Sequence, residues 1–185
     1  MNIQIAETRQ EIEFCKRALM EFRPNLNPDI FVEQVLRMRM EGFHLIYIAD
    51  ENNTDATAIA GFRIFEMLQT GTMIYIDDLF TFEKSRGRGY AKALLDYIGQ
   101  FARTLNIETV HLDSGFDLHP AHRLYLKSGY SLACHHFAKK YSKTEMEIDE
   151  YCLHFNLHYS SALLTTFYMP FSKDLVSKGN VYVSV

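Results

Sequence analysis

The chain changes its hydrophobic period at one short stretch, Arg-Gly-Arg-Gly-Tyr-Ala at residues 86–91. Residues 72–82 before it are typical of a strand, and after it apolar residues recur at helical spacing as far as Leu105. Two glycines permit a tight turn and let a ligand approach the backbone closely. The free amides and the positive dipole end of the following helix favour an anion such as a pyrophosphate.

Two other phosphate-binding motifs can be compared with this stretch. A dinucleotide-binding fingerprint would need glycine where Lys92 stands, and a P-loop would need a Gly-Lys-Ser/Thr ending, which the stretch lacks. A glycine–arginine turn also occurs on ordinary protein surfaces, so the neighbouring elements must decide between a ligand site and a plain turn.

The rest of residues 1–140 mixes strands and helices. The pattern predicts strands at 3–6, 43–49, 57–67, 72–82, 108–113 and 130–138, and helices at 9–22, from Asn27-Pro28 to Gly42, at 91–105 and at 120–128. Thr8 and Glu11 form a capping-box pattern at the start of the first helix. We therefore expect an α/β (α+β) fold with one mixed, mainly antiparallel sheet of six to seven strands flanked by helices.

Residues 141–185 fit this pattern less well. Apolar residues alternate from Tyr151 to Tyr159, and Val181–Val185 resembles a final strand, so we expect a β-rich C-terminal extension that follows a domain of residues 1–140. Its role is open between covering a sheet edge, forming a homodimer by strand pairing, and being a non-native addition.

Charge and composition restrict the partners and the location. The chain has 185 residues, a net charge of −4 and no basic run, which argues against nucleic acid or an anionic membrane as a partner. Cys15, Cys134 and Cys152 have no metal or redox spacing, which favours a reducing, cytoplasmic location. His119 and His122 lie one helical turn apart but lack further ligands at zinc spacing, so we expect no metal.

Two motifs resemble those of a known family. Residues 77–95 (DDLFTFEKSRGRGYAKALL) resemble the acyl-CoA-binding core of the GNAT superfamily of N-acetyltransferases, whose loop reads R/Q-x-x-G-x-G/A; Arg86, Gly89 and Ala91 match it. Residues 121–130 (AHRLYLKSGY) resemble the family's A-x-x-x-Y-x-x-x-G-F block. The resemblance covers about residues 1–140, and one departure is Leu118, where many members carry asparagine.

The resemblance implies a GNAT-like fold and direct acetyl transfer from acetyl-CoA to an amine in a ternary complex. It implies that the pyrophosphate binds at Arg86, Gly87, Arg88, Gly89, Tyr90 and Ala91, and that the pantetheine pairs like an added strand with Phe80, Thr81 and Phe82. A bulge in that strand would turn one amide toward the thioester carbonyl. CoA would enter where the sheet splays between residues 72–82 and 108–113.

Three residues are candidates for catalysis. Tyr125 would protonate the departing thiolate, although it could also be a core tyrosine. Strand alternation sends Asp77 and Asp78 to opposite faces, although a local bulge could exchange those faces, and one of the two could deprotonate or hold the incoming ammonium. The alternative is a surface carboxylate paired with Arg63 on the adjacent strand.

The sequence leaves the acceptor open. A small metabolite, a polyamine-like cation, an antibiotic and a protein amine are all compatible with it, and the acidic pair with the net charge favours a cationic small molecule. The rival interpretation is a non-catalytic acyl-CoA-binding or partner-binding module on the same fold.

Overall fold

A computed structural model describes residues 1–50, 52 and 54–141 of the chain. The strands are β1 (Gln4–Ile5), β2 (Phe43–Ala49), β3 (Ala56–Met67), β4 (Gly71–Thr81) and β5 (Thr109–Leu112). The helices are α1 (Arg9–Phe14), α2 (Lys16–Phe22), α3 (Phe31–Met40), the 3₁₀ helix η1 (Glu83–Ser85), α4 (Tyr90–Thr104) and α5 (His119–Lys127). Residues Met1–Ala133, which contain all of these elements, form one compact unit.

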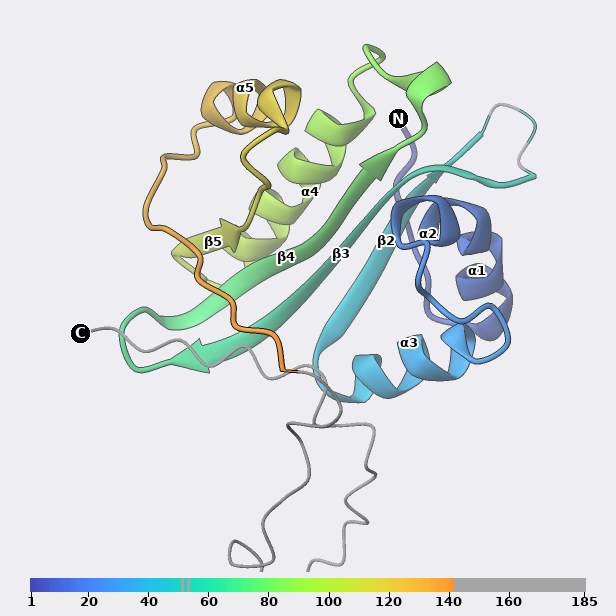
Figure 1. The fold of residues 1–185 in the computed structure, drawn as a ribbon, viewed down its shortest axis with the longest axis horizontal. Helices are drawn as coiled ribbons and strands as arrows, with labels where there is room; N and C mark the ends of the chain where they lie inside the picture. Colours follow the sequence, from blue (N-terminus) through green and yellow to red (C-terminus); the bar gives the residue numbers. More distant parts are fainter. Residues whose placement is uncertain (51, 53, 142–185) are drawn as a thin grey trace, which may run out of the picture. The chain divides into compact units, whose positions relative to one another are not determined.

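The strands form one sheet in the order β1-β2-β3-β4-β5 (Figure 1). All neighbours are antiparallel except β4 and β5, which run parallel. The parallel ladder spans only Met73↔Thr109 to Ile76↔Leu112, whereas β4 continues to Thr81. The sheet is therefore mixed and mainly antiparallel, as predicted, and β4 and β5 separate beyond Ile76.

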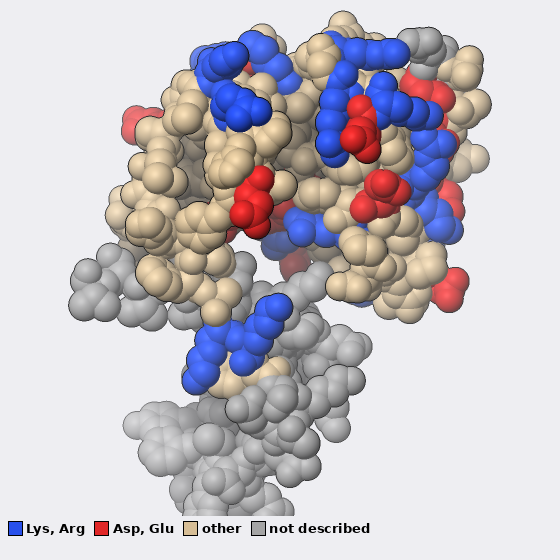
Figure 2. Space-filling model, turned by 45° about the horizontal axis from the view of Figure 1, so that its top comes forward, with Lys and Arg blue, Asp and Glu red and all other residues tan. Residues whose placement is uncertain are grey.

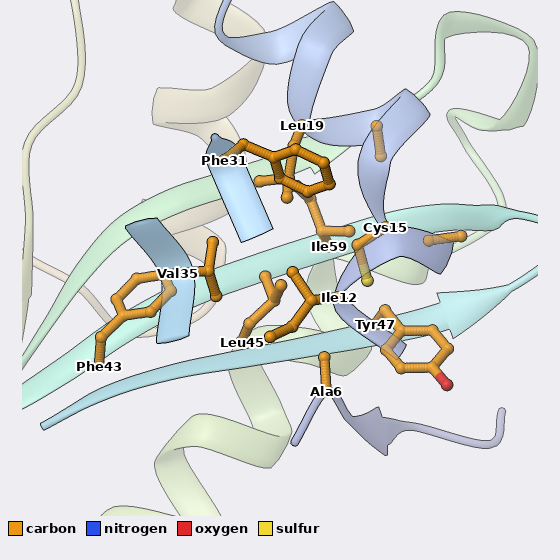
Figure 3. Packing of buried hydrophobic residues seen from close by; sticks show 12 residues of the cluster. Ala6, Ile12, Cys15, Leu19, Phe31, Val35, Phe43, Leu45, Tyr47 and Ile59 are labelled. Atoms are coloured by element: carbon orange, nitrogen blue, oxygen red, sulfur yellow. The ribbon is translucent and has the colours of Figure 1, made fainter. Parts of the chain in front are cut away.

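Two hydrophobic clusters fill the two faces of the sheet. Helices α1–α3 pack on one face, where Ile12, Leu19 and Phe31 meet strand residues such as Leu45 and Ile59 (Figure 3). Helix α4 covers the other face with its apolar stripe of Leu94, Leu95, Ile98 and Ala102. The strand alternation that puts Ala58, Ala60 and Phe62 on the α4 face agrees with the sequence pattern.

The helices at the N-terminus differ from the prediction in two places. The single helix expected over 9–22 is divided at Cys15, whose amide bonds to Ile12 O at 3.0 Å in a tighter turn. The helix expected to begin at Asn27-Pro28 begins at Phe31 instead, because Asn27 Oδ1 accepts the Asp29 amide at 2.9 Å and holds a local turn.

The strand predicted at 130–138 is wrong, because these residues have no regular secondary structure. Alternating apolar residues make a strand only where a partner strand pairs with them, and Leu132 and Phe137 are exposed. The described residues thus hold five strands rather than six or seven. The strands predicted near 151–159 and 181–185 lie outside the described residues, and the division at residues 140 and 141 stays a prediction.

None of the helices that the structure describes is both long and apolar enough to cross a bilayer.

Candidate functional site

The glycine–arginine stretch forms the connection between η1 and α4. Gly87 and Gly89 have φ angles of +77° and +82°, which an L side chain rarely adopts. A Cβ at Gly87 would meet nothing within 4 Å, so the backbone conformation, and not crowding, requires glycine there. Gly89 is the N-cap residue, and its positive φ directs the chain from the turn into α4.

The turn leaves several backbone amides without partners. Within residues 1–50, 52 and 54–141, the amides of Gly87, Gly89, Tyr90 and Ala91 make no hydrogen bond. The first amide that bonds back into the helix is that of Ala93, to Gly89 O at 2.9 Å. Free donors at the positive end of a 15-residue helix make a suitable site for an anion.

Cations surround these amides. Lys84, Arg86, Arg88 and Lys92 fall within nine residues of chain, and Lys92 is paired with Asp96 at 2.6 Å. Arg86 Nε donates to Thr81 O at 3.4 Å, which holds its side chain near the end of β4. Figure 2 shows Lys and Arg side chains along the upper part of this face, beside a hollow, in the region where Figure 1 has α5 and the loop before α4. The positive charge complements the amides as an anion site.

A buried hydrogen bond fixes the chain that leads into the turn. Thr57 Oγ1 on β3 and Ser85 Oγ in η1 lie 2.9 Å apart, and both residues are buried. The Phe82 amide donates to Thr57 O at 3.3 Å. Sequence analysis missed Thr57 and Ser85, because residues 28 positions apart carry no spacing signal.

The end of β4 is exposed where β5 departs. On the β5 side, residues 77–81 of β4 have no paired strand among the residues described. The rings of Phe80 and Phe82 lie 5.1 Å apart and pack on the α1–α3 face. Thr81 Oγ1 is buried, and no described residue bonds to it. An extended ligand could pair with this strand edge. Strand β4 contains two of the three residues predicted to hold the pantetheine, Phe80 and Thr81.

A β-bulge lies in β4 at Asp77. Gly61 pairs with Asp78 and Phe62 with Ile76, so Asp77 is the extra residue in the ladder. Both aspartates contact cations on the α1–α3 face: Asp77 pairs with Arg63, which lies over the Phe43 ring, and Asp78 pairs with Arg23. The prediction that alternation sends them to opposite faces is therefore wrong, because the bulge breaks the alternation.

The two carboxylates are both ion-paired. Arg63 Nε donates to Asp77 Oδ2 at 2.7 Å, and Arg23 Nε donates to Asp78 Oδ1 at 2.8 Å. Their side chains are mostly buried, with 20% of Asp77 and 13% of Asp78 exposed. Burial raises the pKa of Asp77, against the hydrogen bond and charge of Arg63. The Arg63 pairing that the sequence offered as an alternative is thus present, and the pairing of Asp78 with Arg23 was missed.

Tyr125 lies on α5 and packs against the cluster on the α4 face. Its hydroxyl has no hydrogen bond within the described part of the chain, and burial raises the pKa of the phenol. Its ring centre is 6.1 Å from that of Tyr130, whose amide bonds to Tyr125 O at 3.0 Å. The phenol is therefore protonated at neutral pH and only partly buried, which suits an acid but does not distinguish it from a core tyrosine.

The predicted site residues fall into two groups. Residues 86–91 and Tyr125 belong to the part of the fold built on α4, since Tyr90 and Tyr125 pack on the same cluster. Asp77 and Asp78 face α1–α3, where they pair with Arg63 and Arg23. The open end of β4 lies between these groups in the chain.

The histidines take structural roles where the structure describes them. His122 Nε2 lies 2.9 Å from Gly115 O, and the His119 and His122 rings meet edge to face at 6.0 Å. Among the described residues, no three His, Cys, Asp or Glu side chains are grouped in a way that could hold a metal ion.

Solved structures with this fold include acetyltransferases. A ribosomal-protein-alanine N-acetyltransferase from Brucella melitensis biovar Abortus 2308 aligns with a TM-score of 0.65 at 15% identity, over 76% of this chain and 100% of its own. An aminoglycoside acetyltransferase from an uncultured soil metagenomic sample aligns with a TM-score of 0.62 at 17% identity, over 77% of this chain and 100% of its own. At this identity the likeness establishes the fold alone.

Sequence comparison gives the family. Residues 12–130, more than half of the chain, match the model of the acetyltransferase (GNAT) family. The chain is also 29% identical to the uncharacterised N-acetyltransferase YhdJ of Bacillus subtilis (strain 168) over 122 residues. This aligned region covers 65% of this chain and 85% of that relative. The protein therefore belongs to the GNAT family of acetyltransferases.

Proposed function

We propose that this protein transfers an acetyl group from acetyl-CoA to an amine in a ternary complex. The observation that carries the proposal is the set of unbonded amides at Gly87, Gly89, Tyr90 and Ala91, beside an open strand edge at residues 77–81. Family membership adds independent support, because acyl-CoA chemistry is general for GNAT acetyltransferases.

The donor would bind along the glycine turn and the end of β4. Acetyl-CoA supplies an acetyl group already activated as a thioester. The backbone of residues 86–91 would hold its pyrophosphate, with Arg86 and Arg88 adding charge, and the backbone of Phe80, Thr81 and Phe82 would hold its pantetheine. Because the Phe82 amide already donates to Thr57 O, its part is limited to its carbonyl and ring.

The amine would be handled by the residues at the bulge. Asp77 is the better candidate for the base, because burial raises its pKa toward the range in which a carboxylate can accept a proton from an ammonium. Asp78 would position the acceptor or its neighbouring arginine. Tyr125, which keeps its proton at neutral pH, would donate it to the sulfur that leaves. Orientation of the two substrates would supply much of the remaining rate.

The acceptor stays within the class of amines. Two structural neighbours are named for a ribosomal-protein alanine and for aminoglycosides, so this fold serves both protein and small-molecule acceptors. We propose the cytoplasm as the location, in keeping with the free cysteines Cys15 and Cys134. A homodimer formed through residues 141–185 remains part of the proposal.

A thiol-release assay over a panel of amines tests the proposal. We expect acetyl-CoA to raise the melting temperature and CoA to be released only when both acetyl-CoA and an acceptor are present. Acetyl-CoA binding without release across the panel would support the non-catalytic module instead. An unchanged melting curve at saturating acetyl-CoA would reject the donor site itself, and acceptor-free controls measure background hydrolysis.

A further inference from the structure

Two arginines reach the β4 bulge from different elements. Arg23 ends α2, stacks over the Phe22 ring at 4.4 Å and donates from Nη2 to the Asp77 carbonyl at 2.9 Å. Arg63 comes from β3, next to the bulge. It donates from Nε to Asp77 Oδ2 at 2.7 Å, so both arginines contact Asp77, Arg63 at the carboxylate and Arg23 at the backbone carbonyl. The bulge therefore gathers two fixed cations and two carboxylates on one face.

Each guanidinium is anchored and yet keeps free donors. Arg23 uses Nε and Nη2 for Asp78 and for the Asp77 carbonyl, whereas its Nη1 has no partner within the described residues. Arg63 uses Nε alone for Asp77. Side-chain exposure is 52% for Arg23 and 35% for Arg63, so both arginine side chains are partly accessible from solvent. A guanidinium held by one carboxylate is preorganised to bind a second.

The same pairing argues against a polycationic acceptor. The ion pairs at 2.7 Å already neutralise Asp77 and Asp78, whose side chains are mostly buried. A second cation bound there would have to displace an arginine or lie next to it. Because removing one partner from a buried ion pair leaves a charge unpaired, that displacement is costly.

From this arrangement we infer that the acceptor carries an anionic group, a carboxylate, beside its amine, and that Arg23 and Arg63 bind that group. The inference rests on the proposed acetyl transfer and specifies its acceptor as an amino acid or a similar amino carboxylate. The carboxylate would lie on the free Nη groups, while Asp78 Oδ1 holds Arg23, Asp77 Oδ2 holds Arg63, and Asp77 Oδ1 is left for the single ammonium of the acceptor. Arg23 and Arg63 are then specificity-determining residues.

The test compares amines that differ only in the carboxylate. Glycine, alanine and lysine are each assayed against their C-terminal amides, with spermidine as a polycation, by release of CoA from acetyl-CoA. We expect the free acids to be acetylated with kcat/KM at least about tenfold above the amides, the range of one charged hydrogen bond. Arg23→Gln and Arg63→Gln should lower the ratio of kcat/KM for the free acids to kcat/KM for the amides about 10- to 100-fold, because any effect through Asp77 or Asp78 acts on both kinds of acceptor and cancels in the ratio.

The control is Arg9→Gln, which removes an exposed arginine paired with Glu33 on α3, away from the bulge. Melting temperature with and without acetyl-CoA shows whether each variant is folded and binds the donor. If Arg23→Gln fails to fold, the test uses Arg63→Gln and Arg23→Lys instead. Lysine keeps the positive charge but lacks the paired N–H donors of a guanidinium. Equal use of acids and amides, or preference for spermidine, overturns this inference but leaves the acetyl transfer standing. No CoA release with any amine overturns both.

Discussion

A Cβ added at Gly61 would lie 2.8 Å from Oδ2 of Asp78 and 2.6 Å from Cζ of Phe43. Gly61 is the cross-strand partner of Asp78 at the bulge, so the absence of its side chain leaves the room in which the carboxylate meets Arg23. A close approach of this kind explains a glycine inside a strand.

We therefore expect Gly61→Ala to destabilise the protein by about 1–3 kcal/mol, the usual effect of overpacking a well-filled site. Urea unfolding measures the change. Gly99→Ala is the control, because a Cβ at Gly99 within α4 would meet nothing within 4 Å and should stabilise by about 0.5–1 kcal/mol. If both variants unfold at the same urea concentration, the contact at Gly61 is not limiting.

Gly89→Val should abolish the rise in melting temperature that acetyl-CoA gives. A β-branched residue at φ +82° would strain the turn and redirect the amides at the start of α4. The matched control is Gly71→Val, which imposes similar strain at φ +67° in the β3–β4 turn. Retention of the full shift in Gly89→Val would remove the turn from donor binding.

Tyr125→Phe should lower kcat by about 10²- to 10⁴-fold, the usual contribution of a general acid, while the acetyl-CoA-dependent melting shift stays near that of the wild type. The change removes only a hydroxyl that makes no hydrogen bond in the described part of the chain, so folding should be little affected. Tyr130→Phe, which alters the neighbouring ring in the same way, is the control. Equal turnover of wild type and Tyr125→Phe would make Tyr125 a core residue only.

Tyr130 should make stability fall in alkaline solution. Burial raises the pKa of Tyr130 to about 12, above the value near 10 of an exposed tyrosine. The folded state therefore retains a proton that the unfolded state releases, so this contribution is complete below about pH 10 and is lost as pH rises toward 12.

The measurement is the free energy of unfolding in urea between pH 8 and pH 11. Tyr130→Phe should show a shallower decline above pH 10 than the wild type, because other groups that titrate there are common to both. The same decline in both proteins would show that Tyr130 is not responsible.

Local patterns predicted the fold well. Helix α4 was predicted from the helical spacing of its apolar residues, and the structure has this helix, which begins directly after Gly89 and buries Leu94 and Leu95. The capping box at Thr8 is confirmed, since the Thr8 amide donates to Glu11 Oε2 at 2.8 Å and the Glu11 amide to Thr8 Oγ1 at 3.3 Å. Such signals act over a few residues, and tertiary contacts did not override them.

The errors arose where a competing interaction was invisible in the sequence. Pro28 resembled a helix start, but the Asn27 side chain holds a turn ahead of α3. Asp77 and Asp78 were assigned by strict alternation, which a bulge opposite Gly61 breaks. No local pattern could give these outcomes.

The contacts of the candidate site that the sequence did not predict are those between residues far apart in the chain. Arg23 is 55 residues from Asp78, and no spacing pattern in the sequence joins the two residues. Arg63 could be paired with Asp77 in advance, because neighbouring strands of a hairpin have a predictable register. The glycine turn at residues 86–91 could be predicted from sequence because all of its parts are adjacent in the chain.

The two hydrophobic clusters on opposite faces of the sheet support the proposed donor site and the proposed acceptor site separately. Arg23, Asp77 and Asp78 rest on the face that α1–α3 cover, whereas the glycine turn and Tyr125 are built on the face that α4 covers. Substitutions that repack the first face can accumulate without loosening the second. Related proteins could thus differ in the proposed acceptor site while they share the proposed donor site.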